Sequence, residues 1–165
     1  MNLKNKNQKY LRATSVRVND SGNDPTITAV YCPPRYKVDD KKFTEFFRAL
    51  GSRFIAGGDY NDKHTFWGSR LITTKGRDLF KYTNKLEAQF ISTRKPTYWP
   101  TNPSKLSNII DFDVMNGIPS DYIEVEGLIV LMSDHISVLL SLSSNVIVKQ
   151  KKISITNKKT NWELF

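Results

Sequence analysis

The sequence predicts a layered α/β or α+β sandwich, in which helices cover a mostly antiparallel or mixed sheet. Short apolar runs rich in β-branched residues recur along the chain, two segments with helical spacing lie between them, and turn residues separate them. The predicted order is two strands, a helix, a strand, a helix and three strands. With 165 residues, 39% of them apolar, the chain has the length and the apolar content of one domain.

The chain is expected to open with a loose segment and a hairpin. Residues 1–12 are rich in Asn and Lys, and we expect them to be loose and basic. Ser15–Val18 and Thr26–Cys32 flank a cluster of turn residues, a pattern that predicts a β-hairpin. Pro33 and Pro34 then end the second strand, because proline cannot donate a hydrogen bond to a strand ladder.

Two helices are predicted around a short buried strand, Arg53–Ala56. Asp39 and Asp40 cap the first helix, and Gly51 closes it. Its apolar face is formed by Phe43, Phe46, Phe47 and Leu50. The second helix covers about Gly76–Glu87.

The second half is rich in predicted strands. Thr93–Lys105 contains three prolines and is expected to be an ordered loop. The three predicted strands of this half are Leu106–Met115, Ile123–Val130 and Ile136–Leu142, and Phe90–Ser92 is a candidate for a further short strand. One domain is therefore expected over residues 13–144, followed by a basic linker over residues 145–165.

The net charge of +9 comes from the two ends of the chain, where basic tails are commonly just solvated. Residues 35–105 carry fifteen basic and seven acidic groups, whereas residues 106–144 carry six acidic groups and no Lys or Arg. If Asp111 and Asp134 converge, a divalent metal is their natural partner, and a phosphodiester substrate suits a basic region beside such a site. If the acids are scattered over exposed faces, the pattern has no functional meaning.

Several classes of protein are disfavoured. Cys32 is the one cysteine, which excludes an internal disulfide, and two histidines cannot complete a zinc finger with it. No apolar run has transmembrane length and no signal-peptide pattern opens the chain, so we expect a soluble intracellular protein without a membrane partner.

Three segments carry side chains suited to phosphate chemistry. Gly57 and Gly58 end a buried strand and precede Asp59, Asn61 and His64, although an ordinary strand-to-turn junction would look the same. On a strand, Asp111 and Asp113 share one face, which is either a metal site or simply hydrated. His135 stands at a strand entrance, where it is either structural or a general acid or base oriented by a carboxylate.

Together and in this order, these motifs resemble the endonuclease/exonuclease/phosphatase superfamily, the fold of apurinic endonucleases and DNase I. The closest likeness is to the endonuclease domain of jockey-type non-LTR retrotransposons, over roughly residues 10–142. The segments that carry it are Ala29–Pro34, Ile55–Asn61, Lys63–Thr65, Trp67–Arg70, Lys75–Arg77, Pro96–Pro100, Ile110–Phe112 and Ser133–His135. Residues 158–162 resemble the connector towards a reverse transcriptase domain.

The resemblance implies Mg²⁺-dependent (or Mn²⁺-dependent) nicking of DNA that leaves a 3′-hydroxyl to prime reverse transcription of the element's RNA. It implies that Asp59 positions or deprotonates the attacking water and that Asn61 bonds the scissile phosphate. His135 would stabilise the phosphorane-like charge, with Asp111 orienting its ring. Asp134 would belong to the metal environment.

The remaining site residues follow from the same resemblance. Tyr31 matches a tyrosine that approaches the phosphate. His64 and Trp67 match the retroelement branch, where either a DNA contact or a structural role is open for each. Four residues of the proline-stiffened loop are candidates for DNA contacts, although the two aromatic ones are as well explained by packing beneath the loop: Arg94, Lys95, Tyr98 and Trp99.

The chain also departs from the family pattern. The superfamily fold opens with a strand bearing an Asn and a second strand bearing the metal-binding Glu, and residues 1–18 contain no acid that could replace that Glu. We therefore expect a partial four-layer sandwich that lacks the first strands, with an exposed apolar face and weak or absent metal binding and activity. The other expectations are a monomer, a nuclear location with a cytoplasmic stage, and no reverse transcriptase domain. The alternatives are a non-catalytic DNA-binding remnant and a superfamily phosphatase or phosphodiesterase.

Overall fold

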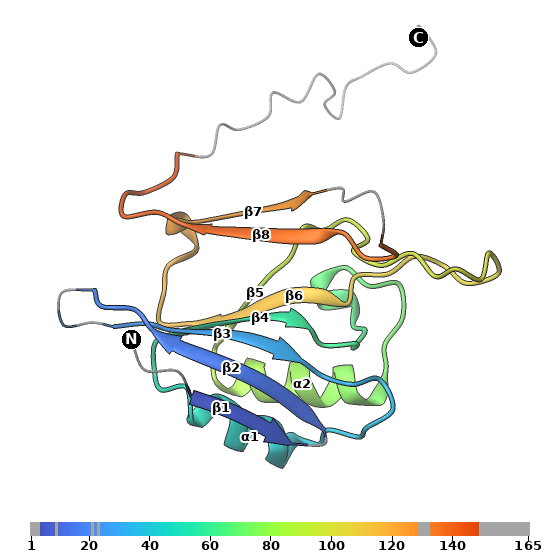
Figure 1. Cartoon of the computed structure of the whole chain (residues 1–165), viewed down its shortest axis with the longest axis horizontal. Helices are drawn as coiled ribbons and strands as arrows, with labels where there is room; N and C mark the ends of the chain where they lie inside the picture. Colours follow the sequence, from blue (N-terminus) through green and yellow to red (C-terminus); the bar gives the residue numbers. More distant parts are fainter. Residues whose placement is uncertain (1–3, 9, 21, 23, 129–132, 149–165) are drawn as a thin grey trace, which may run out of the picture.

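The computed structural model describes residues 4–8, 10–20, 22, 24–128 and 133–148. They form a six-stranded sheet, a two-stranded sheet and a layer of two helices (Figure 1). The elements are β1 (Lys4–Gln8), β2 (Leu11–Arg17), β3 (Thr26–Tyr31), α1 (Asp40–Arg48), β4 (Phe54–Asp59), η1 (Thr65–Trp67), α2 (Thr74–Lys85), β5 (Gln89–Ile91), β6 (Asp111–Asn116), η2 (Ser120–Tyr122), β7 (Ile123–Leu128) and β8 (Ser137–Leu142).

The large sheet is mixed, as predicted, with the strand order β1-β2-β3-β4-β6-β5. The expected hairpin forms, because β2 and β3 pair antiparallel with Arg17 opposite Thr26. β3 and β4 pair in parallel, so the chain must cross over between them, and α1 lies on that crossover. β6 pairs antiparallel with both β4 and β5. This order places the ends of β3 and β4 and the start of β6 side by side.

The start of the chain differs from the expectation of a loose segment. Residues 4–8 form the edge strand β1, which pairs with β2 from Lys4 opposite Ser15 to Gln8 opposite Leu11. The expectation is therefore wrong for these residues, because an edge strand is held by main-chain hydrogen bonds and needs no apolar pattern of its own. β2 also begins earlier than predicted, and its Leu11 and Ala13 are buried in the core.

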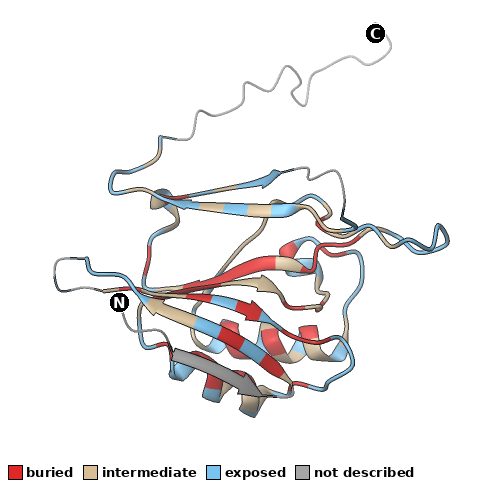
Figure 2. Cartoon of the chain, in the orientation of Figure 1, coloured by how far each residue is buried: buried red, intermediate tan, exposed pale blue. Residues whose placement is uncertain are grey.

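Both helices cover one face of the large sheet, where most of the buried residues lie (Figure 2). Asp39 caps α1 by accepting a hydrogen bond from the Lys42 backbone N–H at 3.0 Å, as predicted. Thr73 caps α2 in the same way, so that helix begins two residues before the predicted start. The aromatic and aliphatic side chains between the helices and the sheet form the main core, which includes Phe43, Phe46, Phe47, Phe54, Leu79 and Tyr82.

The opposite face of the large sheet lies toward the small sheet β7–β8 (Figure 1). A second, smaller core cluster joins the two layers and contains Ile55, Met115, Ile118 and Ile123. Beside it the layers enclose a cleft of about 720 Å³, which is lined by the facing residues of both sheets. Leu139 and Leu142 of β8 are 43% and 45% exposed but point to opposite faces of that strand, so the expected exposed apolar face stays a prediction.

The remaining boundaries shift by a few residues. β4 runs on to Asp59, and β6 begins only at Asp111. β7 ends at Leu128, so the predicted extension to Val130 falls outside the described residues, as does most of the predicted linker. In the part of the chain that the structure describes, no helix has the length and hydropathy needed to cross a membrane.

Candidate active site

A single row across three strands places the first three candidate residues together. Tyr31 on β3 is the register partner of Asp59 on β4, and Asp59 is the partner of Asp111 on β6. Direct partners in a sheet present their side chains on the same face. The three residues therefore share the sheet face that looks toward β7–β8, and Tyr31 is 41% exposed there.

Gly57 and Gly58 precede Asp59, and neighbouring atoms occupy the places that their side chains would fill. Gly57 is the register partner of Asp113, and the Asp113 carboxylate lies where a Cβ on residue 57 would be. Gly58 has a φ of 145° and lies against the backbone of Val30. A side chain at position 58 would press on the β3 backbone at Val30, whereas one at position 57 would displace the Asp113 carboxylate.

Asp113 shares the face of Asp111, as predicted, and it is largely buried in the wall of the cleft between the two sheets. It is 7% exposed, and its carboxylate has no hydrogen-bond or ion-pair partner among the described residues. Burial raises the pKa of Asp113 to about 7. This carboxylate therefore lies below the candidate site and outside the group that converges there.

Asn61 holds the Asp59 carboxylate from both sides. The Asn61 backbone N–H donates to Oδ1 of Asp59 at 2.8 Å, and its side-chain Nδ2 donates to Oδ2 at 2.8 Å. Burial raises the pKa of Asp59 to about 6, and the nearby Asp111 carboxylate adds to this shift. Asp59 is thus an oriented carboxylate whose pKa is close to neutral, which suits it to accept a proton from water.

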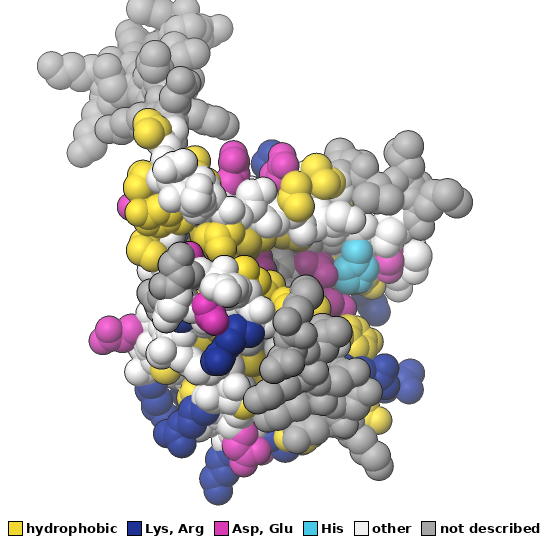
Figure 3. Space-filling view, turned by 60° about the vertical axis from the view of Figure 1, so that its left-hand side comes forward, with side chains coloured by type: hydrophobic (Ala, Val, Ile, Leu, Met, Phe, Trp, Pro, Cys, Tyr) yellow, Lys and Arg dark blue, Asp and Glu magenta, His cyan; other side chains and the backbone are white. Residues whose placement is uncertain are grey.

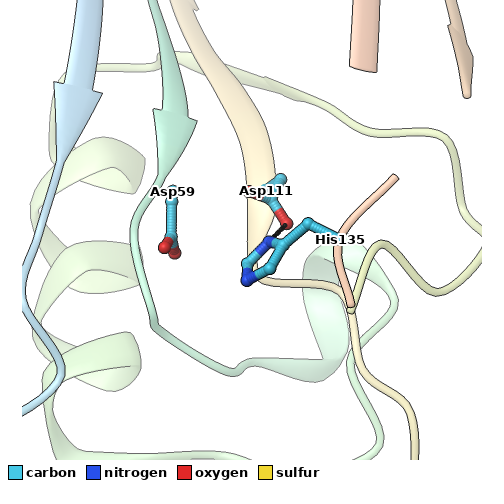
Figure 4. Close-up of side chains that lie close together, drawn as sticks. All are labelled: Asp59, Asp111 and His135. Atoms are coloured by element: carbon cyan, nitrogen blue, oxygen red, sulfur yellow. Dashed lines mark hydrogen bonds and ion pairs between the residues drawn. The ribbon is translucent and has the colours of Figure 1, made fainter. Parts of the chain in front are cut away.

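His135 completes the group from the other sheet. Its Nδ1 lies 3.0 Å from Oδ2 of Asp111, and the ring extends into the space between Asp111 and Asp59 (Figure 4). One ligand atom from each of Asp59, Asp111 and His135 lies within 4.8 Å of the other two. Figure 3 shows a histidine next to acidic side chains at the surface of this face. The predicted carboxylate–imidazole pair is therefore present in the structure.

A threonine that the sequence did not single out positions both halves of this pair. Thr97 is fully buried, and its hydroxyl accepts hydrogen bonds from the backbone N–H groups of Ile110 and Asp111, each at 3.1 Å. Its carbonyl accepts from the Ile136 N–H at 2.9 Å. Thr97 thus ties the start of β6 to the segment that carries His135. The quoted segment Pro96–Pro100 includes this residue, but no spacing rule reveals such a bond.

The proline-containing loop around Thr97 presents three of the four predicted DNA-contacting side chains to solvent. Arg94 and Lys95 are exposed, and Trp99 is 46% exposed. Tyr98 instead packs beside the site, with its ring centroid 4.9 Å from that of His135. Packing therefore explains Tyr98, whereas the exposed Trp99 remains available for a DNA contact.

Trp67 is not available for the expected DNA contact. It is 2% exposed and stacks on Phe112 and Phe90 in the core, so that prediction is wrong and the structural alternative holds. His64 caps η1, because its Nδ1 accepts a hydrogen bond from the Phe66 N–H, and its ring stacks on Phe80. A DNA contact by His64 stays a prediction.

Asp134 is exposed and lies outside the group of three converging side chains. Its backbone carbonyl accepts a hydrogen bond from the Trp99 N–H at 2.7 Å, which helps to fix the neighbouring His135. Its place in a metal environment stays a prediction. The two carboxylates of Asp59 and Asp111 at this spacing suit a hard divalent cation, because Mg²⁺ and Mn²⁺ favour carboxylate oxygen ligands completed by water, whereas the imidazole is bonded to Asp111.

Comparison with known sequences shows similarity to transposon-encoded polymerases. A family model described as endonuclease-reverse transcriptase matches residues 26–139. The probable RNA-directed DNA polymerase from transposon BS of Drosophila melanogaster is 31% identical over 137 residues, which are 83% of this chain and 15% of that protein. The polymerase from mobile element jockey of Drosophila funebris is 34% identical over 84% of this chain and 15% of its own length. The chain thus spans about 15% of the length of these relatives.

Comparison with solved structures supports the fold. The endonuclease domain of TRAS1, a telomere-specific non-LTR retrotransposon, is similar with a TM-score of 0.67 over 85% of this chain and 68% of that domain. The sequence identity is 20%, so this likeness bears on the fold alone. It confirms the predicted α/β fold of the DNase I type.

Proposed function

The chain belongs to the endonuclease-reverse transcriptase family of non-LTR retrotransposons, and from this premise we propose that it hydrolyses a phosphodiester bond in DNA with the help of Mg²⁺ or Mn²⁺. The relatives are RNA-directed DNA polymerases, so the cut would supply a 3′-hydroxyl for copying the element's RNA. The observation that carries the proposal is the convergence of Asp59, Asp111 and His135 from three separate segments.

In the proposed reaction, Asp59 orients the attacking water and accepts its proton. Asn61 keeps both oxygens of that carboxylate in place through its two hydrogen bonds, and its amide is close enough to the row to bond the phosphate. His135, oriented through Nδ1 by Asp111, presents its other ring nitrogen to the charge that develops on the phosphorus oxygens.

A divalent cation held by the carboxylates of Asp59 and Asp111 and completed by water would, when bound, neutralise charge on the phosphate. Tyr31 lies next to Asp59 in the cross-strand row and is exposed, so its hydroxyl is placed to approach the same phosphate. Arg94, Lys95 and Trp99 would hold the flanking DNA.

A nicking assay tests this proposal. Supercoiled plasmid is incubated with Mg²⁺ and either the parent protein, Asp59→Asn, His135→Ala or the control Asp121→Asn, whose side chain is exposed and remote from the group. The parent and the control should convert the plasmid to open circles, and the two site variants should not. Nicking that survives both site substitutions would overturn the assignment.

A second candidate is DNA binding without cleavage, favoured by the exposed Arg94, Lys95 and Trp99 beside the site. Salt-dependent binding in the absence of nicking would support it. Turnover of a soluble phosphomonoester in the absence of DNA would instead indicate a phosphatase. With DNA and the element's RNA as partners, we also propose a nuclear location.

A further inference from the structure

A buried ion pair lies behind the loop that carries Asn61. Asp62 is 1% exposed, and its Oδ1 lies 3.5 Å from Nζ of Lys75, whose side chain is 11% exposed. A second pair, between Asp40 at the start of α1 and Lys85 at the end of α2, has the same 3.5 Å separation. Its side chains, however, are 46% and 69% exposed. Removing each ion from water costs several kcal/mol, which is on the order of the net stability of a small domain. The Asp62–Lys75 pair therefore carries a large desolvation penalty that the exposed pair does not.

The ion pair sits where the loop after β4 rests on the first turn of α2. The Thr73 backbone N–H donates to the Lys63 carbonyl at 2.9 Å, and the Lys63 N–H donates to the Thr73 hydroxyl at 3.2 Å. The Lys63 carbonyl also lies where a Cβ on Gly76 would be, so the two backbones are in direct contact. Lys63, the residue after Asp62, is therefore anchored to Thr73 and Gly76, which lie on either side of Lys75.

Asn61 needs such an anchor. Its φ of 51° is in the left-handed region, which Asn adopts more readily than other non-glycine residues when its side chain is hydrogen-bonded locally, as it is here to Asp59. Its two hydrogen bonds to Asp59 exist only while the backbone keeps that conformation. An apolar side chain at position 62 would be buried equally well, but it would have no preferred partner on α2. A charge pair in a low-dielectric interior strongly favours one placement.

We propose that Asp62 and Lys75 are positioning residues of the site, and that their buried ion pair fixes the loop in the conformation in which Asn61 holds the Asp59 carboxylate. The effect on reaction rate rests on the proposed nuclease function, whereas the effect on Asn61 does not. Neither residue touches the reacting atoms. Removal of either one should therefore loosen Asn61 without removing any group that contacts DNA.

The test compares Asp62→Asn, Lys75→Met, the double variant and the conservative Lys75→Arg. Asp40→Asn serves as the matched control on the exposed pair. Thermal unfolding reports stability, and the ¹H–¹⁵N signals of the Asn61 side-chain amide report the two hydrogen bonds to Asp59. Plasmid nicking with Mg²⁺ gives kcat and KM.

At pH 8, above the pKa of about 7 to which burial raises the Asp62 carboxyl, each single substitution should lower the melting temperature, because it leaves an unpaired buried charge. The double variant should recover most of that loss and so remain folded. In both single variants and in the double variant, the Asn61 amide signals should move to solvent-exposed values. In the same three variants kcat should fall roughly 10- to 100-fold while KM changes little. Lys75→Arg and Asp40→Asn should retain the parent's signals and rate.

A folded double variant with the parent's Asn61 signals would overturn the inference. If the parent does not nick DNA, the proposed function fails, and the amide signals still decide whether the ion pair positions Asn61. A fall in kcat with unchanged amide signals would also refute the mechanism stated here.

Discussion

The buried carboxylate of Asp113 leads to a prediction about the pH dependence of stability. The pKa of Asp113 is raised from its ordinary 3.8 to about 7 because the folded chain removes it from water. A raised carboxyl pKa means that the folded state holds a proton which the unfolded state releases. The stability contributed by this group is therefore fully present in acid and is lost as the pH rises from about 4 through about 7.

The expected size of this effect follows from the two pKa values. Between pH 5 and pH 8, a single carboxyl with a pKa of 3.8 unfolded and about 7 folded reduces the free energy of unfolding by about 2–3 kcal/mol. Asp113→Asn removes this titration and nearly keeps the shape of the side chain. Relative to the parent, the variant should therefore gain about 2–3 kcal/mol of stability across that interval.

Urea denaturation at pH 5, 6, 7 and 8 measures the difference. Asp59 and Asp62 also have raised pKa values, but both remain in the variant, so their contributions cancel in the comparison. The exposed control Asp121→Asn should run parallel to the parent at every pH. If the Asp113→Asn curve also runs parallel to the parent, burial does not perturb this carboxyl and the reasoning is wrong.

Three further outcomes are expected. Thr97→Val should lower the free energy of unfolding by about 2 kcal/mol in urea denaturation, because the backbone N–H groups of Ile110 and Asp111 lose their acceptor; a change below the error of the fit would contradict this. Trp67→Ala should cost about 3–5 kcal/mol in the same measurement, while the folded variant keeps the parent's DNA affinity in a fluorescence anisotropy titration; a specific loss of affinity would restore the DNA-contact role. Lys95→Gln should reduce the slope of log K against log salt concentration for DNA binding by about 1, and an unchanged slope would remove Lys95 from the interface.

The elements that the sequence predicts well are those with local signals. The hairpin follows from a turn cluster between β-branched runs, and α1 follows from Asp39 and four apolar residues at helical spacing. The convergence of Asp59, Asp111 and His135 follows from the family resemblance of the ordered motifs, whereas the residue types alone leave a structural role open for each of them. The hairpin and the helix depend on short-range patterning alone.

The features that escaped prediction depend on tertiary contacts. β1 is held by main-chain pairing, which its polar sequence does not reveal. The burial of Trp67 depends on Phe90 and Phe112, which come from other strands. Nor does any spacing reveal that the Thr97 hydroxyl meets the backbone at Asp111, or that Lys75 faces Asp62. In each case the partner is distant in sequence, so the single residue looks ordinary.

The origin of His135 has a consequence for how the molecule responds to change elsewhere. Asp59 and Asp111 belong to the large sheet, whereas His135 lies two residues before β8 of the small one. The distance between the imidazole and the carboxylates therefore depends both on the hydrogen bonds of Thr97 and on how closely the two layers stack over Ile55, Met115, Ile118 and Ile123. Adding or removing a methyl group at one of these four residues would change the spacing of the two layers. The distance from the imidazole to the carboxylates would then change although every reacting residue stays the same.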